Sequence, residues 1–284
     1  MKRDPDASSA VRVRGLSKAY GKRLAVDGLD LEVGYGEVFA LLGPNGAGKT
    51  TTIEILEGHR KRDSGEVRVL DADPGQAGRA WRSKIGVVLQ DASDSGMLTV
   101  AETVRMFARC YGRSRPPDEV LELVGLGDKV NSKVRTLSGG QRRRLDVALG
   151  IVGMPELVFL DEPTTGFDPE ARRQFWDLIR RLSSDGATIL LTTHYLEEAA
   201  ALADRVAVLA DGKIVAVDSP SKLVQHVNSA ATVQWMEGET MQTVHTDCPT
   251  QVIRQRSTDG AELAELTVTR PTLEDAYLQL IGWA

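Results

Sequence analysis

The stretch Gly43-Pro44-Asn45-Gly46-Ala47-Gly48-Lys49-Thr50-Thr51 decides the fold of this chain. It follows an apolar run, Val38 to Leu42, that is typical of a buried strand, and it precedes Thr52 to Leu56, which is typical of a helix. Two glycines separated by four residues and followed by Lys-Thr form the phosphate-binding loop pattern in its expected strand–loop–helix setting. The sequence therefore predicts a site for a nucleoside triphosphate.

The residue types of this loop match the chemistry of phosphate binding. Glycine has no Cβ, so the backbone can turn its N–H groups toward phosphate oxygens, and the following helix adds its positive N-terminal end. We expect Lys49 to reach the β- and γ-phosphates and Thr50 to place its hydroxyl on Mg²⁺. The alternative, a glycine-rich turn without a ligand, does not require Gly43, Gly48, Lys49 and Thr50 to stand in register.

Bulk composition is that of a globular protein, with 284 residues, 42% of them hydrophobic and 26% charged. This length allows one large domain or two smaller ones. A net charge of −5 argues against a protein that binds nucleic acid through bulk positive charge. Two cysteines, Cys110 and Cys248, show no ligand spacing, which favours free thiols in a reducing compartment.

No apolar run approaches the roughly 20 residues that span a bilayer. The first nine residues, Met1 to Ser9, are polar and lack the apolar centre of a signal peptide, so we expect a disordered tail. These features predict a cytoplasmic protein that acts on membranes only through a partner.

Strand-like and helix-like segments alternate after the loop, which predicts an α/β fold with a mostly parallel sheet covered on both faces. Two strand-like segments around Gly21 and Gly28 precede the loop and predict an antiparallel β subdomain. Residues 92–154 show helical patterns only, so we expect an inserted α-helical subdomain. Residues 10–218 then form the nucleotide-binding domain, and 219–284 form a small accessory domain.

The individual elements follow from apolar periodicity and turn residues. We expect strands at Val67 to Leu70, Ile85 to Leu89, Thr188 to Thr192, Ala231 to Met236 and Leu263 to Thr269, helices at Val100 to Cys110, Pro117 to Val124, Pro169 to Ser184 and Leu273 to Ile281, and a hairpin turn at Asp211-Gly212.

An apolar run, Leu157 to Leu160, ends in Asp161 and Glu162. The carboxyl ends of the strands are where ligands bind in an open α/β sheet. One carboxylate can hold Mg²⁺, and its neighbour can act as general base on a water aimed at the γ-phosphate. A pair of solvated surface carboxylates is the alternative, and the phosphate loop elsewhere in the chain speaks against it.

A second helix N-terminus suited to an anion is predicted at Ser138-Gly139-Gly140-Gln141. A chain with one phosphate loop has no evident use for this second anion site on its own nucleotide. Leu137 to Gln141, placed between a phosphate loop and a strand ending in Asp-Glu, resembles the signature motif of ATP-binding cassette (ABC) ATPases. The resemblance implies a P-loop NTPase with a RecA-like core, with ATP and Mg²⁺ as its ligands.

This resemblance extends over Val11 to Asp218 and implies a role for each motif. Tyr20 falls where such proteins stack an aromatic ring on adenine. A surface tyrosine at the end of a hairpin would give the same sequence pattern and remains the alternative. It implies the catalytic set Lys49, Gln90, Glu162 and His194, the magnesium set Thr50, Gln90 and Asp161, and a set that contacts the nucleotide of a second copy, Ser138, Gly139, Gly140, Gln141 and Asp168. Phe167 stands where leucine is commoner in the family, and we expect this to alter packing only.

The ending Pro271-Thr272-Leu273-Glu274-Asp275-Ala276-Tyr277 is similar to that of bacterial exporter ATPases of the daunorubicin-resistance type, as is Glu162 to Gly166. This similarity implies a head-to-tail pair of chains at the inner face of the cell membrane. It also implies a separate six-helix permease that exports a drug, lipid or polysaccharide. We expect Asp91 to Leu98, with the following helix to Cys110, to receive the permease.

Two other readings of the sequence remain. A soluble ABC ATPase acting on ribosomes or DNA fits less well, because the chain has one cassette and no basic stripe. A binding module without catalysis fits less well because Lys49, Asp161, Glu162 and His194 are all present.

Overall fold

The structure is a computed structural model that describes residues 9–88, 96–226, 230–257 and 262–282. The chain divides into two compact units, Met1–Val217 and Asp218–Ala284. Ser9, which the sequence assigned to the tail, is instead buried as the first residue of a strand. The remaining tail residues and the expected strand residue Leu89 lie outside the described residues.

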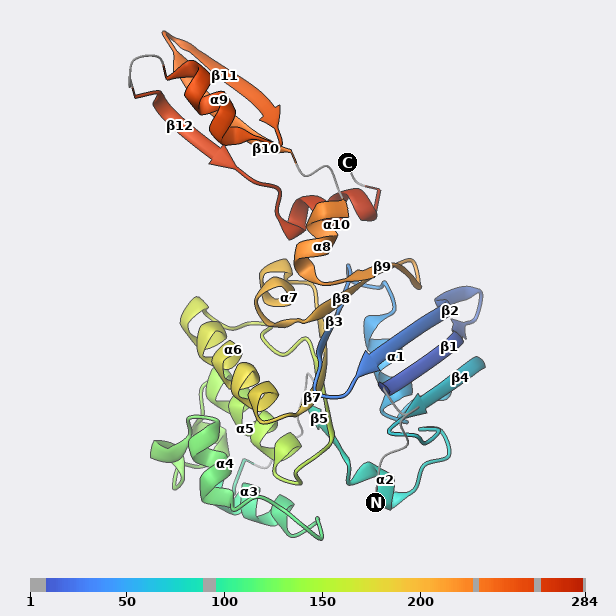
Figure 1. Ribbon diagram of the computed structural model, residues 1–284. Coiled ribbons are helices and arrows are strands. Elements are labelled where there is room, and N and C mark those ends of the chain that lie inside the picture. Colours follow the sequence, from blue (N-terminus) through green and yellow to red (C-terminus); the bar gives the residue numbers. More distant parts are fainter. Residues whose placement is uncertain (1–8, 89–95, 227–229, 258–261, 283–284) are drawn as a thin grey trace. The chain divides into compact units, whose positions relative to one another are not determined.

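A six-stranded sheet forms the centre of the first unit (Figure 1). Its order is β5 (Ile85–Val88), β6 (Leu157–Asp161), β7 (Thr188–Thr193), β3 (Val38–Leu42), β8 (Arg205–Ala210) and β9 (Lys213–Asp218). The pairs β5–β6, β6–β7, β7–β3 and β3–β8 are parallel. Every residue of β3, β6 and β7 is buried, which explains why β3 and the first four residues of β6 are continuous apolar runs.

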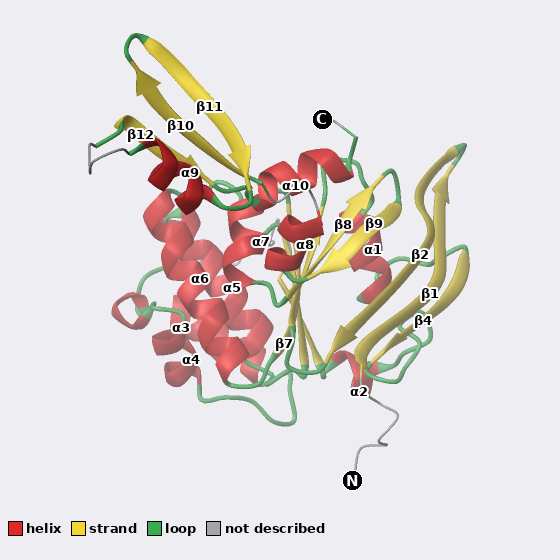
Figure 2. Ribbon diagram, turned by 45° about the horizontal axis from the view of Figure 1, so that its top comes forward, coloured by secondary structure: helices red, strands yellow, loops and turns green. Residues whose placement is uncertain are grey.

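A second, antiparallel sheet has the order β2 (Arg23–Gly34), β1 (Ser9–Tyr20) and β4 (Ser64–Val69). The first turn falls at Gly21, as expected, whereas Gly28 lies inside β2. Helix α1 (Lys49–Leu56) contacts β2 and β4 on one side and β6 and β7 on the other, so it lies between the two sheets (Figures 1 and 2). This packing fixes the phosphate-loop helix from both sides.

The other face of the six-stranded sheet carries helices (Figure 2). The described part of the region expected to be helical, residues 96–154, contains helices and no strand. Its elements are α3 (Val100–Ala108), α4 (Pro117–Leu123), the short 3₁₀ turns η1 (Gly127–Lys129) and η2 (Val134–Thr136), and α5 (Gly139–Ile151). Helix α5 packs closely on β5, since a Cβ on Gly86 would lie 2.2 Å from the Gly150 carbonyl oxygen.

Three further helices complete the first unit. Helix α2 (Arg79–Arg82) was not expected, whereas α6 (Pro169–Ser184) has the predicted bounds. Helix α7 (Leu196–Leu202) follows β7 and contacts α6. Phe167, before α6, places its ring edge-on against Phe175, with 5.8 Å between ring centroids.

The second unit contains an antiparallel sheet of order β11 (Thr240–Thr246), β10 (Ala231–Glu237) and β12 (Ala264–Thr269). Helix α9 (Pro249–Arg256) contacts β10, and α8 (Pro220–His226) contacts α10 (Leu273–Leu280). The sequence had predicted β10, β12 and α10 but not α8, β11 or α9. Within the described ranges no helix is long and apolar enough to cross a membrane.

Candidate nucleotide-hydrolysis site

The phosphate loop joins β3 to α1 and needs glycine at two points of close approach. A Cβ on Gly48 would lie 2.2 Å from the Ala25 carbonyl oxygen, and a Cβ on Gly43 would lie 2.4 Å from that of Leu209. Gly48 also has a φ of 108°, which side chains other than hydrogen rarely allow. Since α1 begins at Lys49, the unpaired N–H groups of its first turn face this loop.

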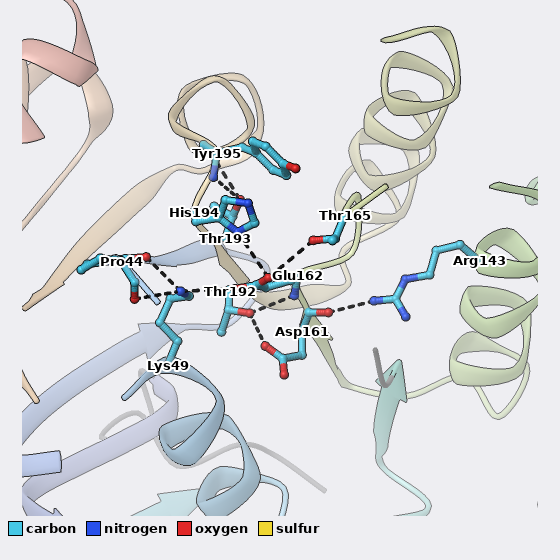
Figure 3. Close-up of polar contacts among 11 residues, drawn as sticks. Pro44, Lys49, Arg143, Asp161, Glu162, Thr165, Thr192, Thr193, His194 and Tyr195 are labelled. Atoms are coloured by element: carbon cyan, nitrogen blue, oxygen red, sulfur yellow. Dashed lines mark hydrogen bonds and ion pairs between the residues drawn. The ribbon is translucent and has the colours of Figure 1, made fainter. Parts of the chain in front are cut away.

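Lys49 is held inside the loop with only 4% of its surface exposed. Its Nζ donates hydrogen bonds to the carbonyl oxygens of Gly43, at 2.9 Å, and Pro44, at 3.2 Å. The same ammonium lies 3.3 Å from Glu162 Oε1 (Figure 3). The positive charge is therefore fixed in position rather than free on a flexible side chain.

A cavity of about 590 Å³ opens beside this loop. Its described lining is Tyr20, Arg23, Ala25, Asn45, Gly46, Gly48, Lys49, Thr50, Thr51 and Glu162. Tyr20 is 43% exposed, with the cations of Arg60 and Lys18 at 5.3 Å and 5.8 Å from its ring centroid. Arg23, which the sequence did not single out, donates from Nη2 to the Gly46 carbonyl oxygen at 2.9 Å.

Thr192, at the end of β7, fixes the two carboxylates that follow β6. Its hydroxyl donates to Asp161 Oδ1 at 2.5 Å and accepts from the Glu162 backbone N–H at 2.9 Å. Glu162 has a φ of 44°, a left-handed conformation that is strained for a residue with a side chain. Pairing of β6 with β7 therefore holds Asp161 and Glu162 at the carboxyl end of β6, and the left-handed turn at Glu162 directs the two side chains differently.

Glu162 lies between Lys49, at the start of α1, and His194, directly after β7 (Figure 3). Its Oε1 faces Lys49, and its Oε2 lies 3.3 Å from Nδ1 of His194, though not in hydrogen-bond geometry. The Thr165 hydroxyl is 3.5 Å from the same Oε2. The His194 ring packs on Tyr195 with 4.1 Å between centroids. Lys49, Glu162 and His194, which are far apart in sequence, thus meet in one place.

Comparison with known proteins agrees with this geometry. A family model described as ABC transporter matches residues 26–165. A daunorubicin/doxorubicin resistance ATP-binding protein of Streptomyces peucetius is 39% identical, over 96% of this chain and 92% of that protein. A Nod factor export ATP-binding protein of Ralstonia nicotianae is 44% identical, over 75% of this chain and 68% of its own length.

The chain belongs to the ABC transporter ATP-binding proteins. Among solved structures, a dimeric ATP-binding cassette in a post-hydrolysis state with ADP and phosphate matches with a TM-score of 0.66 and 26% identity, over 74% of this chain and 98% of that one. This ABC protein is accordingly an ATPase with the expected P-loop NTPase fold.

Two side chains of this ABC protein offer the oxygen donors that a small hard cation such as Mg²⁺ prefers. Thr50 lines the cavity, and Asp161, 8% exposed, ends β6 next to Glu162. Their hydroxyl and carboxylate oxygens fit a magnesium ion that would take its other ligands from water and phosphate. The described residues hold no cluster of three or more His, Cys, Asp or Glu side chains that could hold a metal ion. Gln90 lies outside the described residues.

The signature stretch forms the exposed start of α5. Ser138 is its N-cap: Ser138 Oγ accepts from the Gln141 N–H at 3.3 Å, and Gln141 Oε1 accepts from the Ser138 N–H at 3.1 Å. Asp168 caps α6 in the same way, accepting from the Ala171 N–H at 2.8 Å. The cavity's described lining includes none of Ser138 to Gln141 and not Asp168. The structure therefore does not bring these residues to the chain's own phosphate loop.

Arg143 is a site residue that the sequence did not reveal. It is 7% exposed on α5, and its guanidinium donates to the carbonyl oxygen of Asp161 at 2.8 Å (Figure 3). It also donates to the carbonyl oxygen of Pro163 at 3.1 Å. The signature helix is thereby tied to the backbone on both sides of Glu162. Three consecutive arginines gave no local signal that the middle one is buried.

Glu57, at the end of α1, is a buried carboxyl group, 4% exposed. Burial, followed by the negative charges of Asp161 and Glu54, raises the pKa of Glu57 to about 8. Its Oε2 has no hydrogen-bond partner among the described residues, although His59 Nδ1 is 3.3 Å away. The folded protein therefore holds Glu57 protonated at pH values where the unfolded chain has lost that proton.

We predict that Glu57 makes the folded state less stable as pH rises. Between the ordinary value of 4.5 and about 8, the folded state binds more protons than the unfolded state, so the free energy of unfolding falls with pH. Glu57→Gln keeps the neutral shape and removes this dependence. Near pH 8 its free energy of unfolding should therefore exceed that of the parent by on the order of 1–4 kcal/mol. Urea denaturation across this range measures it, with exposed Glu66→Gln as control. Parallel curves for parent and Glu57→Gln would contradict the assignment.

Proposed function

We propose that this ABC ATPase is the energy-supplying subunit of a bacterial exporter, and that two copies pair head to tail around ATP. The observation that carries the proposal is that Lys49 and Glu162 meet in the cavity lining with His194 next to Glu162, while the residues that start the signature helix are not in that lining. Lys49, Glu162 and His194 supply the hydrolytic chemistry. The start of the signature helix is an anion-binding helix terminus with no nucleotide of its own chain to contact.

The chemistry of the first group follows from its charges. Glu162 is the general base that takes a proton from the water attacking the γ-phosphate, and the loop N–H groups and Lys49 stabilise the negative charge of the phosphates. His194, next to Glu162, donates a hydrogen bond to the γ-phosphate. Mg²⁺, when bound, neutralises charge on the β- and γ-phosphate oxygens, and Thr50, Asp161 and Gln90 are its proposed ligands.

The second copy completes the site in this proposal. The capping box satisfies the Ser138 and Gln141 N–H groups, so the N–H groups of Gly139 and Gly140 are the ones that can meet the γ-phosphate of the partner. Ser138 and Gly139 are exposed and can be reached. Asp168 lies at the start of α6, where it can contact the opposing loop.

A membrane permease is the proposed partner of the paired subunits. The relatives named for daunorubicin resistance and Nod factor export are ATP-binding proteins of drug and export systems. We infer that this chain works at the inner face of the cell membrane and moves a drug, lipid or polysaccharide through the permease. The segment proposed to receive the permease, Asp91 to Leu98, lies mostly outside the described residues, whereas α3 is described.

Tyr20→Ala is predicted to raise KM for ATP roughly tenfold with little change in kcat. Stacking on adenine is made equally in the ground and transition states and is worth about 1–3 kcal/mol per base. Leu24→Ala is the control, because Leu24 is 51% exposed on the facing strand and does not line the cavity. Steady-state kinetics measure both variants. A collapse of kcat at constant KM would exclude the stacking role.

Glu162→Gln is predicted to bind ATP normally and to slow turnover by about 10²- to 10⁴-fold, because it removes the proton acceptor while keeping size. ATP binds the closed pair better than the open one, so the blocked enzyme accumulates as a dimer. Adding Ser138→Arg fills the space for the partner's phosphate and abolishes the dimer without preventing ATP binding to each chain. Size-exclusion chromatography with and without ATP reads this out.

One result would overturn the pairing. If Glu162→Gln stays monomeric at saturating ATP, both alone and beside its permease, the proposed two-chain site is wrong.

A further inference from the structure

Glu198 is a buried carboxyl group that the hydrolytic chemistry does not use. It lies in the first turn of α7, four residues after His194, and is 0% exposed. Burial raises its pKa, and the neighbouring side chains of Thr193, Thr164 and Trp176 oppose that rise. A glutamate enclosed this completely is uncommon, because removing a carboxyl group from water costs stability.

Three segments meet at this carboxyl group. Trp176, on α6, donates from Nε1 to Glu198 Oε1 at 3.4 Å. Thr193 belongs to the end of β7, directly before His194, and Thr164 belongs to the loop that follows Glu162. Glu198 is therefore hydrogen-bonded to the helix that Asp168 caps, and hydroxyl groups from the histidine loop and from the loop after Glu162 lie close enough to lower its pKa.

The same face of α6 also reaches His194 through a stack of side chains. The guanidinium of Arg172, four residues before Trp176, lies 4.6 Å from the centroid of the Tyr195 ring, and that ring packs on His194. The Tyr195 N–H donates to the Thr193 hydroxyl at 2.9 Å, which fixes the turn between them (Figure 3). Arg172 also adds a favourable charge to Glu198.

The hydrogen bonding of this cluster is incomplete. Glu198 Oε2, Thr164 Oγ1 and Arg172 Nε are buried without a hydrogen-bond partner in the part of the chain that the structure describes. A residue kept only for stability would be better apolar or fully bonded, since unsatisfied buried polar groups are unfavourable. The arrangement points instead to a functional reason for an acid here.

We propose that Glu198 is a positioning residue for His194, holding the loop of Thr193 to Tyr195 against α6 and the Thr164 loop so that the imidazole faces Glu162. This inference rests on the proposed role of His194 at the γ-phosphate. Glu198 would also connect α6, which begins at the proposed interface between copies, to the loop that carries His194.

The test compares three variants of the full chain. Glu198→Ala removes the carboxyl group, Glu198→Gln keeps an acceptor for Trp176, and the control Glu66→Gln changes a glutamate of β4 whose side chain is 65% exposed. We expect Glu198→Ala to lower kcat by about 10- to 100-fold with KM for ATP within about twofold, as for other residues that orient a catalytic group. Glu198→Gln should recover most of this loss, and Glu66→Gln should match the parent.

Imidazole NMR resonances of ¹⁵N-histidine-labelled protein show whether the effect passes through His194. Its resonances, assigned with His194→Asn, should shift or broaden in Glu198→Ala and return in Glu198→Gln, while those of His59 and His245 stay unchanged. Unmoved His194 resonances, or equal movement of all of them, would overturn the proposal. Parent-like turnover in His194→Asn would instead disprove the proposed role of His194, and the resonances would still test its positioning by Glu198.

Discussion

The position of one carboxylate, Glu162, constrains the whole site. Its backbone N–H bonds to Thr192, its φ of 44° turns the chain sharply, and its two oxygens face Lys49 and His194. Thr192 and His194 come from the end of β7 and the residue after it, and Lys49 comes from the start of α1. The sheet register, the buried Thr192 hydroxyl and the phosphate loop must therefore all be correct before the acid, the lysine and the histidine can act together.

The helical region is attached to this carboxylate through its backbone. Arg143 on α5 binds the carbonyl oxygens of Asp161 and Pro163, and α5 starts at the capped Ser138. On the opposite side of the site, Glu198 and α6 hold the histidine loop. In the proposed pair, a shift of the partner's nucleotide at Ser138 would be transmitted along α5 to Arg143 and from there to the backbone beside Glu162. This connection gives a physical basis for coupling hydrolysis to opening and closing of the dimer.

Local patterns were sufficient to predict much of this. Buried strands followed by glycine or by Asp-Glu predicted β3, the phosphate loop and β6, because such runs carry their own signal. Strand β11 was missed because Thr240 to Thr246 is mostly polar, and α9 because its apolar periodicity is weak. Arg143 and Glu198 could not be found from sequence, since their function depends on which carbonyls and side chains the fold brings to them. The predicted roles of Tyr20, Gln90 and the signature residues stay predictions.

Complementation of two inactive variants tests the central claim that each site is shared between two chains. Lys49→Ala damages the phosphate loop, and Ser138→Arg damages the signature helix. In a mixed pair, one site carries both lesions, and the other combines the intact loop of the Ser138→Arg chain with the intact signature of the Lys49→Ala chain. If each site is shared, mixing the two purified variants restores ATP hydrolysis well above the sum of their separate rates. A mixture no more active than that sum would contradict it.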